Sequence, residues 1–249
     1  MHPKPRFEEL DYQKTELGEL ILRRRTILSL ENREVYEIIL GEAFLMTSLF
    51  TEVETALGSL GMAAAAKHFP GDGALDVVVG GLGLGHTVRA ALDHPGTRSL
   101  IAVDFLKPVI KWHQQGLVPL GARPSADPRC RFVHADFFAC ALAADGEPGF
   151  DPETPDRKFH AILLDIDHSP ANLLHDRHAE FYRPEGLRRL ARKIHPGGVF
   201  ALWSDDPPAE DFTSALHEIF VGCESHIVSF FNPLQDRDSE STVYIARLK

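Results

Sequence analysis

The sequence has few cysteines, no long apolar run and no large basic cluster. The 3 cysteines among 249 residues, Cys130, Cys140 and Cys223, lie far apart and form no CxxC pair, as expected of reduced thiols in a cytosolic protein. No apolar stretch approaches the roughly 20 residues that a membrane-spanning helix requires. Residues 1–20 are polar and lack the apolar core of a secretory signal peptide. These absences predict a cytoplasmic protein with no membrane partner.

The charge balance of the chain is acidic. It has 26 Lys and Arg against 36 Asp and Glu, which gives a formal net charge of −10. Because nucleic-acid binding depends on clustered basic side chains, this balance argues against nucleic acid as a partner. The short run from Arg23 to Arg25 is better explained as the solvated end of a strand. We therefore expect a small molecule as the substrate.

The first part of the chain predicts a small separate region. Residues 18–30 and 33–46 alternate apolar and polar side chains, which predicts two or three antiparallel strands. Residues 49–69 have the apolar spacing of a helix, and residues 70–73 read as a linker. We therefore predict an N-terminal β-hairpin and helix region over residues 1–70.

Residues 71–249 predict an α/β domain. Five strands are expected at Leu75–Val79, Ser99–Val103, Arg131–His134, Ala161–Asp165 and Val199–Trp203. Helices are expected between them, near Thr87–Leu92, Pro108–Gln115, Pro184–Ile194 and Ala209–Phe220. This alternation is typical of a parallel sheet covered on both faces. The chain then ends in two apolar segments joined by a polar turn, which predict a C-terminal antiparallel hairpin.

A glycine-rich turn follows the first predicted strand of this domain. Its glycines are Gly80, Gly81, Gly83 and Gly85. Turns of this kind let a ligand approach the backbone and the unpaired N–H groups of the next helix. A dinucleotide fingerprint has the spacing G-x-G-x-x-G, but here His86 stands where its third glycine would be. The spacing favours a Rossmann-like fold that binds S-adenosylmethionine over one that binds a dinucleotide.

Acidic residues end the next three strands. Ligands bind beyond the carboxyl ends of strands in open α/β sheets, so these side chains are candidate ligand contacts. Asp104 could accept both hydroxyls of a ribose, and Asp136 an exocyclic adenine amine, with the Phe137 ring beside it. Asp165 would lie beside the reacting atoms. Any one of these acids could equally cap a helix, but the set together indicates an adenosyl nucleoside site.

The residues after the fourth strand could take part in chemistry. Alkyl transfer from a sulfonium needs positioned partners and, for a poor nucleophile, a base. We assign Asp165 to orienting the acceptor and Asp167 or His168 to general base catalysis, although His168 could equally be a solvated loop histidine. Trp203, which ends the fifth strand, is a candidate lid over the acceptor, and core packing explains it equally well.

A metal site is not expected. His175 and His178 form a His-x-x-His pair in the loop after the fourth strand. Catalytic zinc has three protein ligands in most sites, and no third is evident. We expect this loop to close over the acceptor instead.

The chain resembles the spermidine synthase-like branch of the S-adenosylmethionine methyltransferase fold. The resemblance runs from about Glu19 to the C-terminus and rests on "GGLGLGHTVRAAL", "VDFLKPVIKW", "DPRCRFVHADFF", "ILLDIDHSP" and "HPGGVFALW". It implies a class I methyltransferase fold preceded by a small β-region. It also implies that the acids matching Asp104 and Asp136 hold ribose and adenine, and that the acid matching Asp165 orients an attacking amine. Members that make polyamines use decarboxylated S-adenosylmethionine.

Two departures from this family lie close to the nucleotide site. Its synthases carry an aspartate inside the glycine turn that engages the ammonium of the aminopropyl group, whereas this chain has Leu82 and Leu84 there. In the loop after the fourth strand, the second acid of the family moves to Asp167, and His168 is inserted.

Further departures affect the acceptor pocket. Trp203 replaces a glutamine of the family, and the helix that carries tyrosine and histidine in its members offers only Glu52 and Glu54 here. A polyamine needs carboxylates in place of its water, so these losses favour methyl transfer from intact S-adenosylmethionine to a small-molecule acceptor. Aminopropyl transfer from the decarboxylated form and a non-catalytic nucleoside-binding module are the alternatives. The N-terminal strands would suit a homodimer interface.

Overall fold

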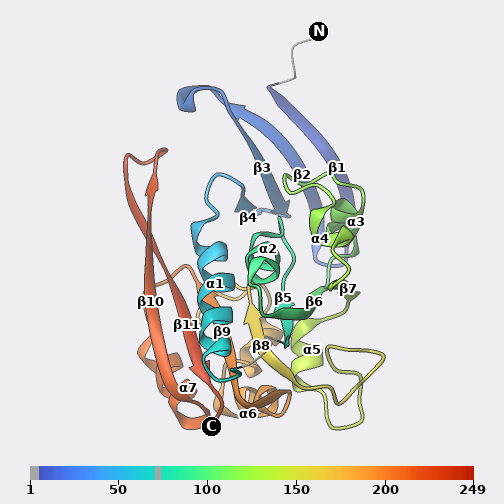
Figure 1. The fold of residues 1–249 in the computed structure, drawn as a ribbon. Coiled ribbons are helices and arrows are strands. Elements are labelled where there is room, and N and C mark those ends of the chain that lie inside the picture. The colour runs from blue at the N-terminus through green and yellow to red at the C-terminus, as the bar shows by residue number, and fades with distance from the viewer. Residues whose placement is uncertain (1–5, 71–73) are drawn as a thin grey trace.

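The protein consists of an N-terminal antiparallel sheet and a larger sheet covered by helices (Figure 1). The computed structural model describes residues 6–70 and 74–249. The N-terminal sheet has the order β1-β2-β3-β4. Its strands are β1 (Phe7–Thr15), β2 (Gly18–Ile27), β3 (Arg33–Leu40) and β4 (Ala43–Thr47). The first strand, β1, was missing from the sequence prediction because it is an edge strand with exposed polar side chains, so it carries little apolar alternation.

The larger sheet has seven strands in the order β10-β11-β9-β8-β5-β6-β7. Its parallel strands are β5 (Leu75–Gly80), β6 (Thr97–Asp104), β7 (Cys130–His134), β8 (Phe159–Leu164) and β9 (Ile194–Ser204). The antiparallel hairpin is β10 (Val221–Asn232) and β11 (Arg237–Arg247), and β11 pairs with β9. Because β5 lies between β6 and β8, the strand order reverses on either side of it. The carboxyl end of β5 is therefore the expected place for a ligand.

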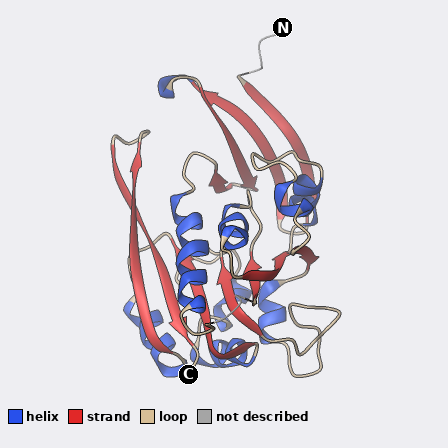
Figure 2. Cartoon of the chain, in the orientation of Figure 1, coloured by secondary structure: helices blue, strands red, loops and turns tan. Residues whose placement is uncertain are grey.

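Helices cover both faces of this sheet (Figure 2). They are α1 (Glu52–Ala66), α2 (His86–Asp93), α3 (Lys107–Gln114), α4 (Arg123–Ala126), α5 (Phe137–Leu142), α6 (Pro184–Arg192) and α7 (Glu210–Ile219). Two 3₁₀ turns lie elsewhere along the chain: η1 (Leu28–Leu30) between β2 and β3, and η2 (Asp176–Glu180) between β8 and α6. Val77 and Val79 of β5 pack on the face of α1 and α2, and Val78 packs on the opposite face. Both faces of the sheet are thus buried, as the continuous apolar run of β5 predicts.

The α/β fold and its C-terminal hairpin are confirmed. Helix α1 packs on α2 and β9, so it covers the larger sheet although it precedes that sheet in the sequence. The division at residue 70 stays a prediction, and the linker expected at residues 70–73 lies, from residue 71 on, outside the described residues. Within residues 6–70 and 74–249, no helix combines the length and apolar character needed to cross a bilayer.

Candidate functional site

A cavity of about 530 Å³ lies at the carboxyl ends of the parallel strands, and residues of both sheets line it. Strands β3 and β4 contribute apolar side chains, including Ile38, Phe44 and Met46. Six acidic residues line it as well: Glu16, Glu54, Asp104, Asp136, Asp165 and Asp205. Pockets of 300–1,000 Å³ are typical for small ligands, so this one has room for a nucleoside with part of an acceptor.

The glycine turn lies under this cavity, and its glycines are required by packing inside the protein. A Cβ at Gly81 would lie 2.0 Å from the Asp165 carbonyl oxygen, and Gly81 has φ +88°. A Cβ at Gly83 would lie 2.5 Å from Met46 Sδ. Gly81 and Gly83 line the cavity, whereas Gly80 packs against the Phe137 ring and Gly85 against His113. The spacing of the turn thus fits its neighbours from four other parts of the chain.

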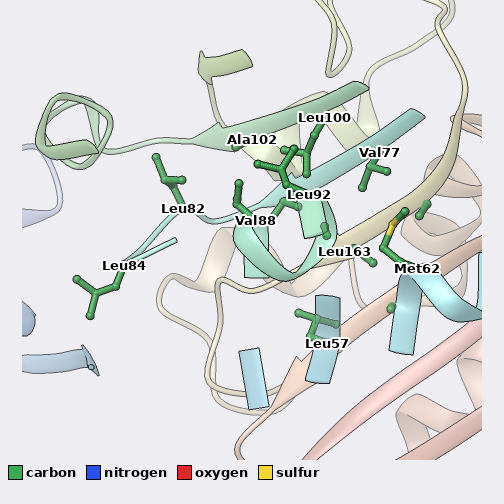
Figure 3. Close-up of a cluster of buried hydrophobic side chains, with 14 of the residues drawn as sticks. Leu57, Met62, Val77, Leu82, Leu84, Val88, Leu92, Leu100, Ala102 and Leu163 are labelled. Atoms are coloured by element: carbon green, nitrogen blue, oxygen red, sulfur yellow. The ribbon is translucent and has the colours of Figure 1, made fainter. Parts of the chain in front are cut away.

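The two leucines of the turn point into the core. Leu82 and Leu84 are buried together with side chains of α1, α2 and β6 (Figure 3). Only their backbones face the site, since the Leu82 N–H donates to Asp104 Oδ2 at 2.9 Å and the Leu84 N–H to Met46 Sδ at 3.1 Å. Their side chains therefore reflect core packing and carry no information about the charge of the ligand.

Asp104 is held at the bottom of the cavity by backbone donors. Its Oδ2 accepts the Leu82 N–H, and its Oδ1 accepts the Leu106 N–H at 2.7 Å. Burial raises the pKa of Asp104 to about 6, against the opposing effect of these hydrogen bonds. A carboxylate oxygen has two lone pairs, so both oxygens retain capacity to accept ligand hydroxyls.

Asp136 divides its two oxygens between helix and cavity. Its Oδ1 caps α5, accepting N–H groups from Phe138 at 2.9 Å and Ala139 at 3.3 Å. Its Oδ2 lies 3.4 Å from Nη2 of Arg177. Phe137 lines the cavity as expected, but so does Phe105, which sequence reasoning missed. Its position directly after the strand-end acid Asp104 could have indicated it.

Glu54 and Asp165 meet at a second acidic position. The Thr87 hydroxyl donates to Asp165 Oδ2 at 2.6 Å and lies 3.2 Å from the Glu54 carbonyl oxygen, so Thr87 links α1 to the end of β8. Burial raises the pKa of Asp165 to about 6. Burial, together with the charge of Asp165, raises the pKa of Glu54 to about 8. One of the two carboxyls is therefore protonated near neutral pH. Thr87 was not predicted from the sequence.

Asp167 is buried away from the cavity and anchors the segment after β8. It is 1% exposed, and its carboxylate accepts hydrogen bonds from the Leu174 N–H at 2.8 Å, the Tyr182 hydroxyl at 2.8 Å and His178 Nδ1 at 2.8 Å. Burial and the charge of Asp167 raise the pKa of Tyr182 well above its usual range, which keeps this hydroxyl a donor. The geometry thus gives Asp167 a positioning role.

The remaining predicted site residues are divided between the cavity and the surface. His168 and Trp203 both line the cavity, with ring centroids 6.4 Å apart. Glu52 is exposed at the start of α1, and its carboxylate accepts the Thr51 N–H at 2.8 Å. His175 Nδ1 accepts the N–H of Arg177 at 3.1 Å. Among the residues that the structure describes, no group of three or more His, Cys, Asp and Glu could hold a metal ion.

Comparisons with known proteins support the resemblance seen in the sequence. No family model matches the chain. A curated relative, polyamine aminopropyltransferase 2 of Pseudomonas aeruginosa, is 28% identical over 159 residues, which are 61% of this chain and 41% of the relative. The chain thus matches less than half the length of that relative.

Solved structures give the same result for the fold. Spermidine synthase from Thermotoga maritima aligns with a TM-score of 0.70 at 15% identity, covering 96% of this chain and 72% of that one. The fold is that of the spermidine synthases. A spermidine synthase in complex with the transition state analogue AdoDATO aligns with a TM-score of 0.69 at 14% identity, over 96% and 72% of the two chains. Human methyltransferase-like protein 13, in complex with SAH, aligns less closely, with a TM-score of 0.51 at 16% identity and 80% coverage of each chain.

Proposed function

We propose that this protein transfers an aminopropyl group from decarboxylated S-adenosylmethionine to an amine, as in polyamine synthesis. The observation that carries the proposal is the pair of Glu54 and Asp165 in the same cavity as Asp104 and Asp136. The first pair suits a cationic amine, and the second suits an adenosyl group. The similarity to a polyamine aminopropyltransferase supports the same activity.

The donor would be held by residues on either side of the glycine turn. Asp104 accepts the ribose hydroxyls, Asp136 accepts the adenine amine, and the Phe105 ring contacts the base. The structure fits such a group, since Asp104 is buried yet keeps free lone pairs beside Gly81 and Gly83. The donor supplies a carbon activated by the neighbouring sulfonium.

The carboxyl pair would bind and deprotonate the amine. With pKa values of about 6 for Asp165 and about 8 for Glu54, one of the two carboxyls is ionised and one protonated at neutral pH. The pair then has one negative charge, which attracts one ammonium group. Asp165 orients the amine and accepts the proton that the nitrogen loses before it attacks. The nitrogen forms a bond to the activated carbon as the carbon–sulfur bond breaks, which leaves a neutral thioether.

Methyl transfer, which the sequence favoured, has weaker support. That reading depended on the lost acceptor carboxylates and Trp203, and on Leu82 and Leu84 standing in place of an acid in the glycine turn. Both side chains lie in the core, and Glu54 supplies a carboxyl from α1 to the cavity instead. His168 and Trp203 line the acceptor side of the cavity and stay candidate acceptor contacts.

The test is a product assay with both donors. The protein is incubated with decarboxylated or intact S-adenosylmethionine and a series of diamines, and methylthioadenosine and S-adenosylhomocysteine are measured by mass spectrometry. We expect methylthioadenosine, formed only with the decarboxylated donor and an amine. S-Adenosylhomocysteine formed in its place would establish methyl transfer and contradict the proposal.

A variant pair tests the role of Glu54. Glu54→Gln should raise the KM for the amine about two- to tenfold, because the pair keeps its one negative charge and loses only a neutral hydrogen-bonding group, which contributes about 0.5–1.5 kcal/mol. Glu210→Gln is the control, since Glu210 also lies in the first turn of a helix but is exposed and away from the cavity. Equal KM values for the two variants would show that Glu54 does not bind the amine. The homodimer and the cytoplasmic location stay predictions, to be checked by light scattering and cell fractionation.

A further inference from the structure

The Arg177 side chain lies over the two side chains that we assign to adenine. Its guanidinium carbon is 5.0 Å from the centroid of the Phe105 ring, and its Nη2 is 3.4 Å from Asp136 Oδ2. All three residues line the cavity. Arg177 belongs to η2, which comes from a part of the chain different from β6 and β7.

The position of Arg177 is set by an anchored segment. The next residue, His178, is bonded to buried Asp167 and stacks on the Phe138 ring with centroids 3.8 Å apart. On the other side, His175 Nδ1 accepts the N–H of Arg177 itself. The backbone of Arg177 is therefore fixed, while its side chain, 41% exposed, reaches out over the cavity. Only this side chain has to move for Phe105 and Asp136 to become free.

A guanidinium and an adenine present the same chemistry to these two partners. Each is planar, stacks on an aromatic ring and offers N–H groups to a carboxylate. Asp136 has only Oδ2 to offer, since Oδ1 caps α5. Both contacts that recognise adenine are thus made by Arg177.

We infer that Arg177 competes with the adenine of the donor for the place between Phe105 and Asp136. The inference rests on the proposed function, since it assumes that the donor carries an adenosyl group. Donor binding then displaces the Arg177 side chain, which makes Arg177 a residue that sets donor affinity.

The size of the effect follows from the two contacts that Arg177 gives up. An exposed cation–π contact and a partly exposed ion pair each change an equilibrium by about two- to fivefold. Together they predict that loss of the side chain tightens adenine binding about four- to twenty-fivefold. Had Arg177 instead covered the outer face of a bound adenine, the same variant would bind more weakly.

The experiment measures binding of 5′-methylthioadenosine by isothermal titration calorimetry to the whole protein. Arg177→Ala should bind it about four- to twenty-fivefold more tightly than the wild type, and Arg177→Lys should lie between them because it keeps the charge without the planar face. Arg188→Ala is the control, since it removes another half-exposed arginine with one ion pair on α6, and it should match the wild type. Raising the salt concentration should tighten binding to the wild type but not to Arg177→Ala, because methylthioadenosine is uncharged.

The outcomes separate the inference from the function on which it rests. Equal or weaker binding by Arg177→Ala, with clear binding by the wild type, overturns the competition and leaves the adenosyl site intact. Absence of binding to the wild type and all variants overturns both. If Arg188→Ala also binds methylthioadenosine more tightly than the wild type, the effect comes from the lower positive charge of the protein in general. That result would also overturn the competition.

Discussion

The buried carboxylate of Asp167 offers a sharp test of how the site is built. The change is Asp167→Asn, which keeps the shape of the side chain but replaces one acceptor oxygen with an NH₂ group. Three donors bond to this carboxylate, from Leu174, His178 and Tyr182. The Tyr182 hydroxyl donates to Oδ2 at 2.8 Å, so in the variant it would face a donor.

The loss can be estimated from these contacts. Hydrogen bonds to a charged group contribute about 1.5–3 kcal/mol and neutral ones about 0.5–1.5 kcal/mol. Loss of one bond and weakening of two others predicts a decrease of about 2–4 kcal/mol in the free energy of unfolding. For a chain of this length, the melting temperature should fall by about 5–15 °C.

The assay is urea denaturation of both proteins, together with limited proteolysis. We expect the segment between β8 and α6 to be cleaved faster in the variant, because Asp167 holds its backbone at Leu174. Asp176→Asn is the control, since Asp176 is an exposed acid of the same segment. If Asp167→Asn keeps wild-type stability but abolishes turnover, the positioning role is refuted and Asp167 acts in the chemistry, as the sequence suggested.

Two further predictions concern the glycine turn and the carboxyl pair. Gly81→Ala should unfold the protein or destabilise it by more than about 3 kcal/mol, whereas the control Gly146→Ala should cost about 1–2 kcal/mol. Both glycines have positive φ, but only at Gly81 would the new Cβ lie 2.0 Å from a carbonyl oxygen. Similar urea midpoints for the two variants would contradict the clash at Gly81. The pKa of Glu54 is raised from 4.5 to about 8, so the folded state binds more protons than the unfolded chain in this range and stability should fall as pH rises through it. Glu54→Gln should make the unfolding free energy less dependent on pH between about 6, the pKa of Asp165, and about 8, the pKa of Glu54. An unchanged slope of unfolding free energy against pH would show that Glu54 titrates normally.

Much of the fold could be predicted from local patterns. The apolar run of β5, the glycine turn and the acids Asp104, Asp136 and Asp165 all lie where the alternation of strands and helices indicated. This succeeded because the carboxyl ends of parallel strands share one edge of a sheet, so residues far apart in sequence are brought together by topology alone. The polar edge strand β1 has no such pattern and was missed.

Side-chain direction inside the site could not be predicted in this way. The sequence determines that leucines occupy the glycine turn, but only the tertiary structure turns Leu82 and Leu84 into the core and brings Met46 over Gly83. In a turn with positive φ, the direction of a side chain depends on what packs around it, not on a periodic repeat.

The same distinction applies to the chemistry. The sequence by itself determined a Rossmann-like sheet with acidic residues at its strand ends, because strand periodicity and strand-end residues are local features. Only the tertiary structure brought Glu54 from α1 to Asp165, buried Asp167 under the loop and laid Arg177 over Phe105. Burial and neighbouring charges set the pKa and the role of a carboxyl group, and both depend on contacts between distant parts of the chain.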